Sequence, residues 1–197
     1  MPRDIRKNIA LTGFMAVGKS AVGRRLAERL QRPFVDLDRA IEFREGMTVE
    51  EIFSTKGEAY FRGVEKETLK EVLGRDGQVI ATGGGAVLDE DNLRLLRERS
   101  LLIRLTASPH SLLKRSGRNQ RRPLLQGPNR RERIEDLLAE RENAYRQAHL
   151  SLDTSLIPVN TVVEKIIEEM NRRRGKNEQT ADVAGCKEAG KADDSDS

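Results

Sequence analysis

The strongest constraint in this sequence is a glycine-rich segment, Gly13 to Ser20, which reads GFMAVGKS. It matches the pattern G-x-x-x-x-G-K-[ST] and lies directly after an apolar run and directly before a segment of helical period. In such a loop the backbone N–H groups and the following helix dipole bind phosphates, Lys19 adds a charge, and the Ser20 hydroxyl is a ligand for Mg²⁺. The sequence therefore predicts a site for a nucleoside triphosphate with Mg²⁺. Its residues are Gly13, Ala16, Val17, Gly18, Lys19 and Ser20.

The rest of the body alternates short apolar runs with longer segments of helical period. This alternation predicts crossover units that build a parallel sheet with helices on both faces, so the expected class is a three-layer α/β/α domain. Five runs have strand length: Asn8–Thr12, Pro33–Asp36, Gln78–Ala81, Leu101–Leu105 and Leu150–Asp153. Helices are expected over Lys19–Leu30 and Val159–Arg174, and from Asp38, Thr48, Gly57, Asp89, Pro109 and Asn129.

Composition limits what kind of protein this is. The 197 residues, 37% of them hydrophobic, fit one domain with a sizeable core. The single cysteine, Cys186, excludes an internal disulfide framework and a thiolate metal cluster within one chain. No apolar run approaches the roughly 18 residues of a membrane span, and the N-terminus lacks a signal-type stretch, so a soluble cytoplasmic protein is expected.

The net charge of +4 is unevenly distributed. Residues 175–197 carry three lysines and six acids, a net charge of −3, which leaves about +7 on residues 1–174. The terminal segment has no apolar periodicity and is expected to be a disordered acidic tail. The functional domain is therefore assigned to residues 1–174.

Two carboxylates follow the second expected strand, at Asp36 and Asp38. On an extended segment side chains at i and i+2 point the same way, and the carboxyl ends of parallel strands open onto the ligand crevice. One carboxylate can hold the hydration shell of Mg²⁺, and the other can accept a proton from an acceptor hydroxyl. The alternative interpretation is that Asp38 only caps the next helix.

Three consecutive glycines, Gly83, Gly84 and Gly85, follow the third expected strand and indicate a close approach to the backbone, with a flexible loop as the alternative. Two arginines are further candidates. Arg62 has Glu65 one helical turn away to orient it, and Arg141 lies on the helix that leads to Tyr145. Each could equally form a surface salt bridge.

A basic stretch from Lys114 to Arg133 contains eight basic residues and one acid. Glycine and proline flank its middle, a pattern typical of a mobile lid, here about residues 114–128, that closes over phosphates. The alternative is a nucleic-acid-binding loop, but the stretch has no aromatic residue for stacking on bases.

Taken together, these motifs resemble the shikimate kinase family, small P-loop enzymes with the nucleoside monophosphate kinase architecture. The resemblance covers roughly residues 8–170. Its marks, in order, are Gly13–Ser20, Asp36-Leu37-Asp38, Gly57-Glu58 with Phe61-Arg62 and Glu65, the triple glycine after Ala81-Thr82, Arg122-Pro123-Leu124-Leu125, and Arg141 with Tyr145.

The resemblance implies transfer of the γ-phosphoryl group of ATP to the 3-hydroxyl of shikimate, with Mg²⁺ as cofactor. It implies that Asp38 binds ring hydroxyls and is the candidate base, that Arg62 and Arg141 hold the carboxylate, and that Gly83, Gly84 and Gly85 contact the ring. It further implies that Ser20 binds Mg²⁺ directly and Asp36 through water. Lys19 and Arg122 would stabilise the transferring group, and Arg115 would lie against adenine.

Other functions remain open at this point. A small-molecule kinase with gluconate or a nucleoside monophosphate as acceptor shares the P-loop and the lid. A non-catalytic P-loop protein that binds nucleic acid through its basic segments is the alternative from another class. The residues favour a monomer that binds two small anions, ATP and a carboxylated acceptor, and no nucleic acid or membrane.

Overall fold

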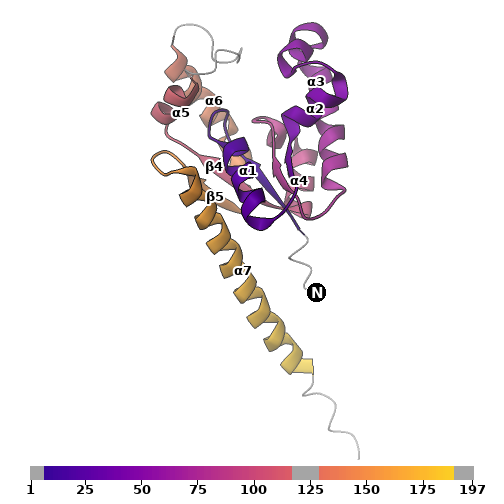
Figure 1. Cartoon of the computed structure of the whole chain (residues 1–197), viewed down its shortest axis with the longest axis vertical. Helices are drawn as coiled ribbons and strands as arrows, with labels where there is room; N and C mark the ends of the chain where they lie inside the picture. The colour runs from indigo at the N-terminus through magenta and orange to yellow at the C-terminus, as the bar shows by residue number, and fades with distance from the viewer. Residues whose placement is uncertain (1–6, 117–128, 189–197) are drawn as a thin grey trace, which may run out of the picture. The chain divides into compact units, whose positions relative to one another are not determined.

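The computed structural model describes residues 7–116 and 129–188, with side chains up to residue 173. It divides into two units, Met1–Val162 and Val163–Ser197, and the first contains every candidate site residue of the sequence. That unit is built on a sheet of five parallel strands in the order β2-β3-β1-β4-β5. Figure 1 labels two of these strands, β4 and β5. The α/β class expected from the alternating pattern is therefore confirmed.

The strands agree closely with the apolar runs of the sequence. They are β1 (Asn8–Thr12), β2 (Phe34–Asp36), β3 (Val79–Ala81), β4 (Ser100–Thr106) and β5 (Leu150–Asp153). Strands β1 and β3 are buried on both faces, as inner strands of a parallel sheet are. In β1, for example, Ile9, Ala10 and Leu11 are at most 1% exposed. An uninterrupted run of apolar residues was therefore enough to locate these two strands in the sequence.

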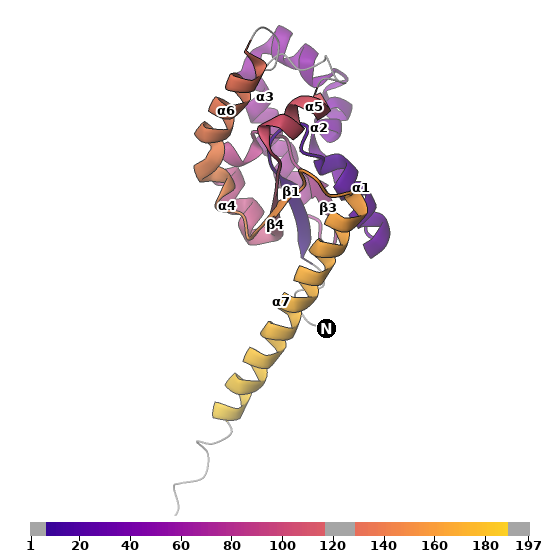
Figure 2. The ribbon, with the colours of Figure 1, turned by 90° about the vertical axis from the view of Figure 1, so that its left-hand side faces the viewer.

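Helices cover both faces of this sheet. They are α1 (Lys19–Leu30), α2 (Leu37–Glu45), α3 (Val49–Leu73), α4 (Glu90–Arg99), α5 (Pro109–Ser116) and α6 (Arg130–Tyr145), with a short 3-10 helix, η2 (Ala86–Leu88). The last helix, α7 (Val159–Glu188), belongs mostly to the second unit. Figure 2 shows α1 and α4 on opposite sides of the sheet, as right-handed crossovers in opposite directions require. None of the described helices is long and apolar enough to cross a membrane.

Local signals set the start and the interruption of α3. Thr48 caps it in a capping box with Glu51, whose carboxylate accepts from the Thr48 backbone N–H at 2.7 Å. Gly57 interrupts it with φ 82° and ψ 171°, so α3 spans the two helices that the sequence predicts from Thr48 and from Gly57. The second half, after Gly57, carries Arg62 and Glu65.

The end of α7 differs from expectation. The sequence predicts an unstructured segment from Gly175, whereas α7 continues to Glu188. This stretch has no proline and is rich in helix formers, so the intrinsic helix propensity of its residues can favour a helix although the stretch has no apolar stripe. In the first part of α7 the expected stripe is present, since Val162, Val163 and Ile166 are at most 1% exposed.

Candidate active site

The glycine-rich segment forms the turn between β1 and α1, as its sequence context requires. Gly13 has φ 135°, and a Cβ there would lie 2.2 Å from the Leu105 carbonyl oxygen, so no other residue fits. Lys19 is the first residue of α1, and its Nζ donates to the carbonyl oxygens of Gly13 at 2.8 Å and Phe14 at 3.1 Å. The lysine charge therefore lies directly over the loop that the motif assigns to phosphate.

Ala16, at the tip of this loop, takes the left-handed conformation with φ 61°. A side chain with Cβ costs roughly 1–2 kcal/mol there relative to glycine. Because Ala→Gly also raises the entropy of the unfolded chain, by about 0.4–1 kcal/mol, we expect Ala16→Gly to increase the free energy of unfolding by about 0.5 kcal/mol. Ala139→Gly, in the exposed middle of α6, should instead lower it by about 1 kcal/mol. Urea unfolding measures the free energy of unfolding of both variants. Equal decreases in Ala16→Gly and Ala139→Gly would contradict backbone strain at Ala16.

Ser20, the second residue of α1, meets Asp36, the last residue of β2. The Ser20 hydroxyl donates to Oδ2 of Asp36 at 2.6 Å, although sixteen positions separate the two residues. A hydroxyl beside a carboxylate offers the hard oxygen ligands that Mg²⁺ prefers. Within the described residues no group of three or more His, Cys, Asp or Glu could hold a metal ion.

Asp38 is not on an extended segment, so that part of the sequence interpretation was wrong. Helix α2 begins at Leu37, directly after β2, with Asp36 as its N-cap residue and Asp38 in its first turn. Strand β2 ends at Asp36, as expected, and α2 begins at the next residue, the completely buried Leu37. Asp38 still lies at the carboxyl end of β2, so the two carboxylates remain near each other on one edge of the sheet.

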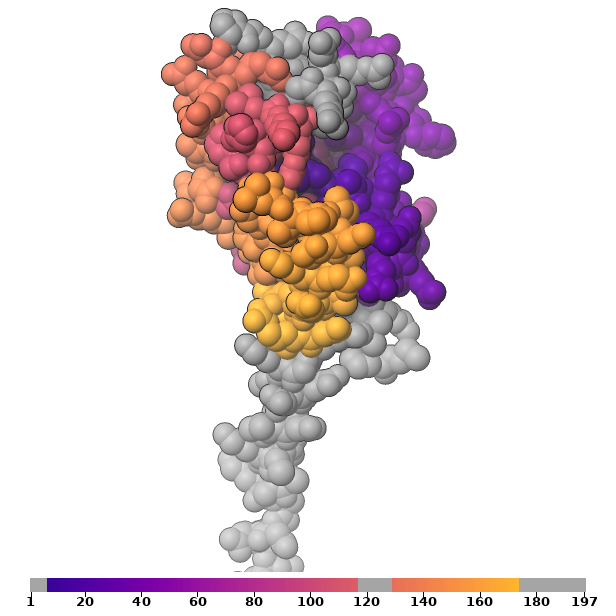
Figure 3. Space-filling view, turned by 60° about the vertical axis from the view of Figure 1, so that its left-hand side comes forward, coloured from indigo at the N-terminus to yellow at the C-terminus, as the bar shows by residue number. Residues whose placement is uncertain are grey.

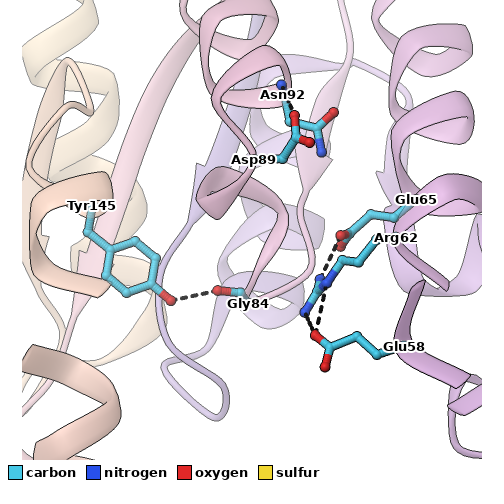
Figure 4. A network of polar contacts seen from close by, with 7 residues as sticks. All are labelled: Glu58, Arg62, Glu65, Gly84, Asp89, Asn92 and Tyr145. Atoms are coloured by element: carbon cyan, nitrogen blue, oxygen red, sulfur yellow. Dashed lines mark hydrogen bonds and ion pairs between the residues drawn. The ribbon is translucent and has the colours of Figure 1, made fainter. Parts of the chain in front are cut away.

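Arg62 lies between two glutamates of its own helix (Figure 4). Its Nη1 donates to Oε2 of Glu65 at 2.7 Å, and its Nη2 donates to Oε1 of Glu58 at 3.0 Å. Glu65 is 1% exposed, and burial raises its pKa while the pairing with Arg62 opposes that rise. Among the described residues its other oxygen, Oε1, has no hydrogen-bond partner. Glu65 thus fixes the guanidinium and presents a second acceptor atom at the same site.

The triple glycine is the point at which these groups converge. A Cβ on Gly83 would lie 2.6 Å from Oε1 of Glu65 and 3.1 Å from Oδ1 of Asp38. A Cβ on Gly85 would lie 2.8 Å from both terminal nitrogens of Arg62. The absence of side chains in this loop is therefore what lets three charged groups approach its backbone, so the loop is a packed surface and the flexible-loop alternative is not needed.

Gly84 faces the other candidate groups. Its hypothetical Cβ is 3.6 Å from the Met15 nitrogen, 3.7 Å from the Gly13 oxygen and 4.0 Å from Nη1 of Arg141. Arg141 is 9% exposed on α6, and its guanidinium carbon lies 5.7 Å from the centre of the Phe14 ring. The phosphate loop and the arginine of α6 therefore meet on the same side of Gly84.

Arg115 joins segments on the nucleotide side. From α5 it donates to the Val17 carbonyl at 3.2 Å and to the Thr154 hydroxyl at 3.0 Å and carbonyl at 2.5 Å. Thr154 is 3% exposed, and its hydroxyl lies 3.1 Å from the Val17 carbonyl. Figure 3 shows α5 beside the segment that follows β5, which these bonds connect. The base of the expected lid is thereby tied to the phosphate loop.

A protein-family model described as "Shikimate kinase" matches residues 15–171 of the chain. The chain belongs to the shikimate kinase family. A "Shikimate kinase" of Pelotomaculum thermopropionicum is 46% identical over 161 residues, which cover 82% of this chain and 94% of the relative. One from Thermus thermophilus is 44% identical over 165 residues, covering 83% and 90%.

Solved structures agree with this membership of the shikimate kinase family. "Shikimate kinase from Acinetobacter baumannii in complex with shikimate" has a TM-score of 0.83 and 37% identity, covering 86% of this chain and 96% of that one. A gluconokinase from Sinorhizobium meliloti has a TM-score of 0.55 at 15% identity, which is a likeness of fold alone. This member of the shikimate kinase family is therefore an ATP-dependent phosphotransferase.

Most of the predicted site residues come together in this shikimate kinase-family fold. Asp38, Arg62 and Arg141 all surround the triple glycine, and Lys19, Ser20 and Asp36 line the adjoining phosphate loop. Arg122 and the lid residues 117–128 lie outside the described residues.

Sequence reasoning assigned no role to two buried hydroxyls, those of Thr154 and Tyr145. Their positions in the sequence could have indicated a role, because Thr154 directly follows β5 and Tyr145 follows Arg141 by one helical turn.

Proposed function

We propose that this chain transfers the γ-phosphoryl group of ATP to the 3-hydroxyl of shikimate, giving shikimate 3-phosphate and ADP. The observation that carries the proposal is the convergence on the triple glycine. Asp38 and Glu65 approach Gly83, Arg62 approaches Gly85, and both Arg141 and the phosphate loop approach Gly84. A small cyclic molecule with one carboxylate and several hydroxyls matches this set of two cations and two acids on one glycine surface.

The nucleotide half of the site is formed by the phosphate loop, Gly13 to Ser20, and the start of α1. The backbone of Gly13, Ala16, Val17 and Gly18 and the N-terminus of α1 provide N–H groups and a positive dipole for the phosphates. Lys19 exchanges its carbonyl partners in the loop for the β- and γ-phosphate oxygens. Arg115 is held beside Val17, from where the flat face of its guanidinium can stack on adenine.

Ser20 and Asp36 fit a Mg²⁺ ion by the chemistry of their oxygens, as their 2.6 Å contact supports. The ion would be held directly by the hydroxyl and through water by the carboxylate, and it would supply neutralisation of phosphate charge. This chain's own contribution is to keep both oxygens at the edge of the phosphate loop.

The acceptor half uses the charged groups around the triple glycine. Arg62 and Arg141 bind the carboxylate through charge-assisted hydrogen bonds, ideally in bidentate geometry. Asp38 accepts from the ring hydroxyls and takes the proton of the attacking 3-hydroxyl. Oε1 of Glu65, which lacks a partner among the described residues, is an acceptor for a substrate hydroxyl or a water. Arg122 of the lid would complete the charge stabilisation on the transferring group.

A coupled assay of ADP release tests the proposal. The folded protein is supplied with Mg-ATP and, separately, with shikimate, gluconate and nucleoside monophosphates. We expect ADP release that depends on shikimate and stays at background with the other acceptors. Release with gluconate or a nucleotide alone would reassign the acceptor, and salt-sensitive nucleic-acid binding without ATP turnover would support the non-catalytic alternative.

The two arginines that are proposed to bind the shikimate carboxylate, Arg62 and Arg141, can be tested by substitution. Arg62→Ala and Arg141→Ala should each raise the KM for shikimate about 10- to 100-fold and leave the KM for ATP within about twofold, since each removes hydrogen bonds to a charged group. Arg44→Ala is the matched control, because Arg44 also bridges two glutamates, Glu67 and Glu71, and is similarly exposed, at 37% against 34% for Arg62. It should change neither constant. A rise in the KM for ATP in place of that for shikimate would move the arginines to the nucleotide side.

The remaining expectations complete the proposal. The kinase domain occupies residues 1–174, acts as a cytoplasmic monomer and binds no nucleic acid or membrane. Its surplus of positive charge is concentrated where ATP and the acceptor carboxylate bind, which supports small anions as the partners. Light scattering of the purified protein measures the oligomeric state.

A further inference from the structure

Tyr145 is a buried hydroxyl that the proposed chemistry does not use. It is the last residue of α6 and is 1% exposed. Its Oη donates to the Gly84 carbonyl oxygen at 2.6 Å, across 61 positions of sequence (Figure 4). Burial raises the pKa of this phenol, so the hydroxyl remains a donor at any physiological pH. The middle glycine of the loop is therefore attached to α6.

The Tyr145 ring is itself held from the side of the sheet. The Arg104 guanidinium of β4 lies 5.4 Å from the ring centre. Arg104 makes a bidentate pair with Glu142, with Nη1 donating to Oε1 at 3.1 Å and Nη2 donating to Oε2 at 2.5 Å. Because Glu142 is on α6, the pair ties the end of this helix to β4 and limits how far the phenol can move.

This attachment connects two groups of the acceptor site. Arg141 precedes Tyr145 by one turn on the same helix, and its Nη1 lies 4.0 Å from the hypothetical Cβ of Gly84. The Tyr145 hydroxyl thus fixes the distance between the helix that carries Arg141 and the loop that forms the floor of the site. The Met15 nitrogen and the Gly13 oxygen of the phosphate loop lie 3.6 Å and 3.7 Å from the same hypothetical Cβ.

We propose that Tyr145 is a positioning residue for the acceptor: its hydroxyl holds the Gly84 backbone in register with Arg141 and so sets the affinity for shikimate. The inference rests on the proposed roles of Arg141 and the triple glycine. Tyr145 does not touch the substrate. It acts through Gly84, and it does so on the acceptor side because its helix partner is the carboxylate-binding arginine.

Tyr145→Phe removes the hydroxyl and keeps the buried ring. One neutral hydrogen bond corresponds to a factor of about 2 to 13, so we expect the KM for shikimate to rise about five- to tenfold while the KM for ATP stays within about twofold. Tyr60→Phe is the matched control. It removes the hydroxyl of the other of the chain's two tyrosines, which donates to Oε2 of Glu45 at 2.8 Å on an exposed face, and both constants should remain unchanged.

A spectroscopic readout tests the same inference without altering Tyr145. The chain has no tryptophan and two tyrosines, so in Tyr60→Phe the tyrosine emission comes from Tyr145 alone. Titration with shikimate should change this emission saturably, with a midpoint near the shikimate KM, because the substrate loads the Gly84 carbonyl and Arg141 next to the phenol. A phenol that only fills the core would give no change.

The outcomes separate cleanly. An unchanged shikimate KM in folded Tyr145→Phe, an equal rise in both KM values, or emission in Tyr60→Phe that does not respond to shikimate would each overturn the role of Tyr145. If Tyr145→Phe does not fold, the emission titration decides alone. Failure of the proposed function looks different, because then wild-type protein would not release ADP with shikimate, or Arg141→Ala would leave the shikimate KM unchanged.

Discussion

Asp38→Asn is expected to lower kcat about 10²- to 10⁴-fold, the range that a positioned general base contributes. Asparagine keeps the size of the side chain and its ability to bind hydroxyls, but it cannot take the proton of the acceptor. ATP binding should be retained, because the contacts of the phosphate loop come from Lys19, Ser20 and Asp36. Steady-state turnover and equilibrium titration with ADP measure the two properties separately.

A matched control for this substitution is Asp91→Asn. Asp38 and Asp91 are both acids in the first turn of a helix, of α2 and α4 respectively, so each loses about 0.3–1 kcal/mol of interaction with the helix dipole. Asp91 pairs with Lys66 and Arg94 on the surface, and its replacement should leave kcat unchanged. Normal turnover by Asp38→Asn would show that positioning and electrostatics alone carry the transfer and that Asp38 is no base.

The phosphate half of the site could be predicted from the sequence because its signal is local. Eight consecutive residues define the loop, and a buried strand and an amphipathic helix flank them, so motif and context agree. The strands could be found for a similar reason, since β1 and β3 are buried on both faces and read as uninterrupted apolar runs. Short-range pattern and final structure coincide wherever burial is nearly complete.

The acceptor half could be predicted only as a set of residues, because its geometry depends on contacts between distant segments. The sequence predicts a helix from Asp38, but α2 begins one residue earlier, at the buried Leu37, and this places Asp38 off the extended segment. The bond from Tyr145 to Gly84 spans 61 positions, and the partnerless oxygen of Glu65 is a property of packing. The sheet order places β2 beside β3, and α6 packs against η2, the short helix that follows the triple glycine.

Gly83→Ala is expected to lower kcat/KM for shikimate by about 100-fold or more. The φ of Gly83 lies outside the left-handed region, so alanine can adopt its backbone, and the effect must come from space. The new Cβ would lie 2.6 Å from Oε1 of Glu65 and 3.1 Å from Oδ1 of Asp38. Both carboxylates must move, and a displacement of about 1 Å at a catalytic group can cost a factor of about 10².

Gly63→Ala separates this steric effect from the general consequence of adding a methyl group. Gly63 lies on the exposed face of α3 with no heavy atom within 4 Å of a hypothetical Cβ, so alanine there should stabilise the helix by about 1 kcal/mol without altering kinetics. At Gly83 the buried carboxylate of Glu65 resists displacement, so Gly83→Ala should also lower the free energy of unfolding, by about 1–3 kcal/mol. If the triple glycine is a packed floor, thermal unfolding shows changes of opposite sign in the two variants, and steady-state kinetics shows a loss in Gly83→Ala alone. Wild-type kinetics in Gly83→Ala would mean that the loop can shift away from Asp38 and Glu65, and that its glycines serve flexibility instead.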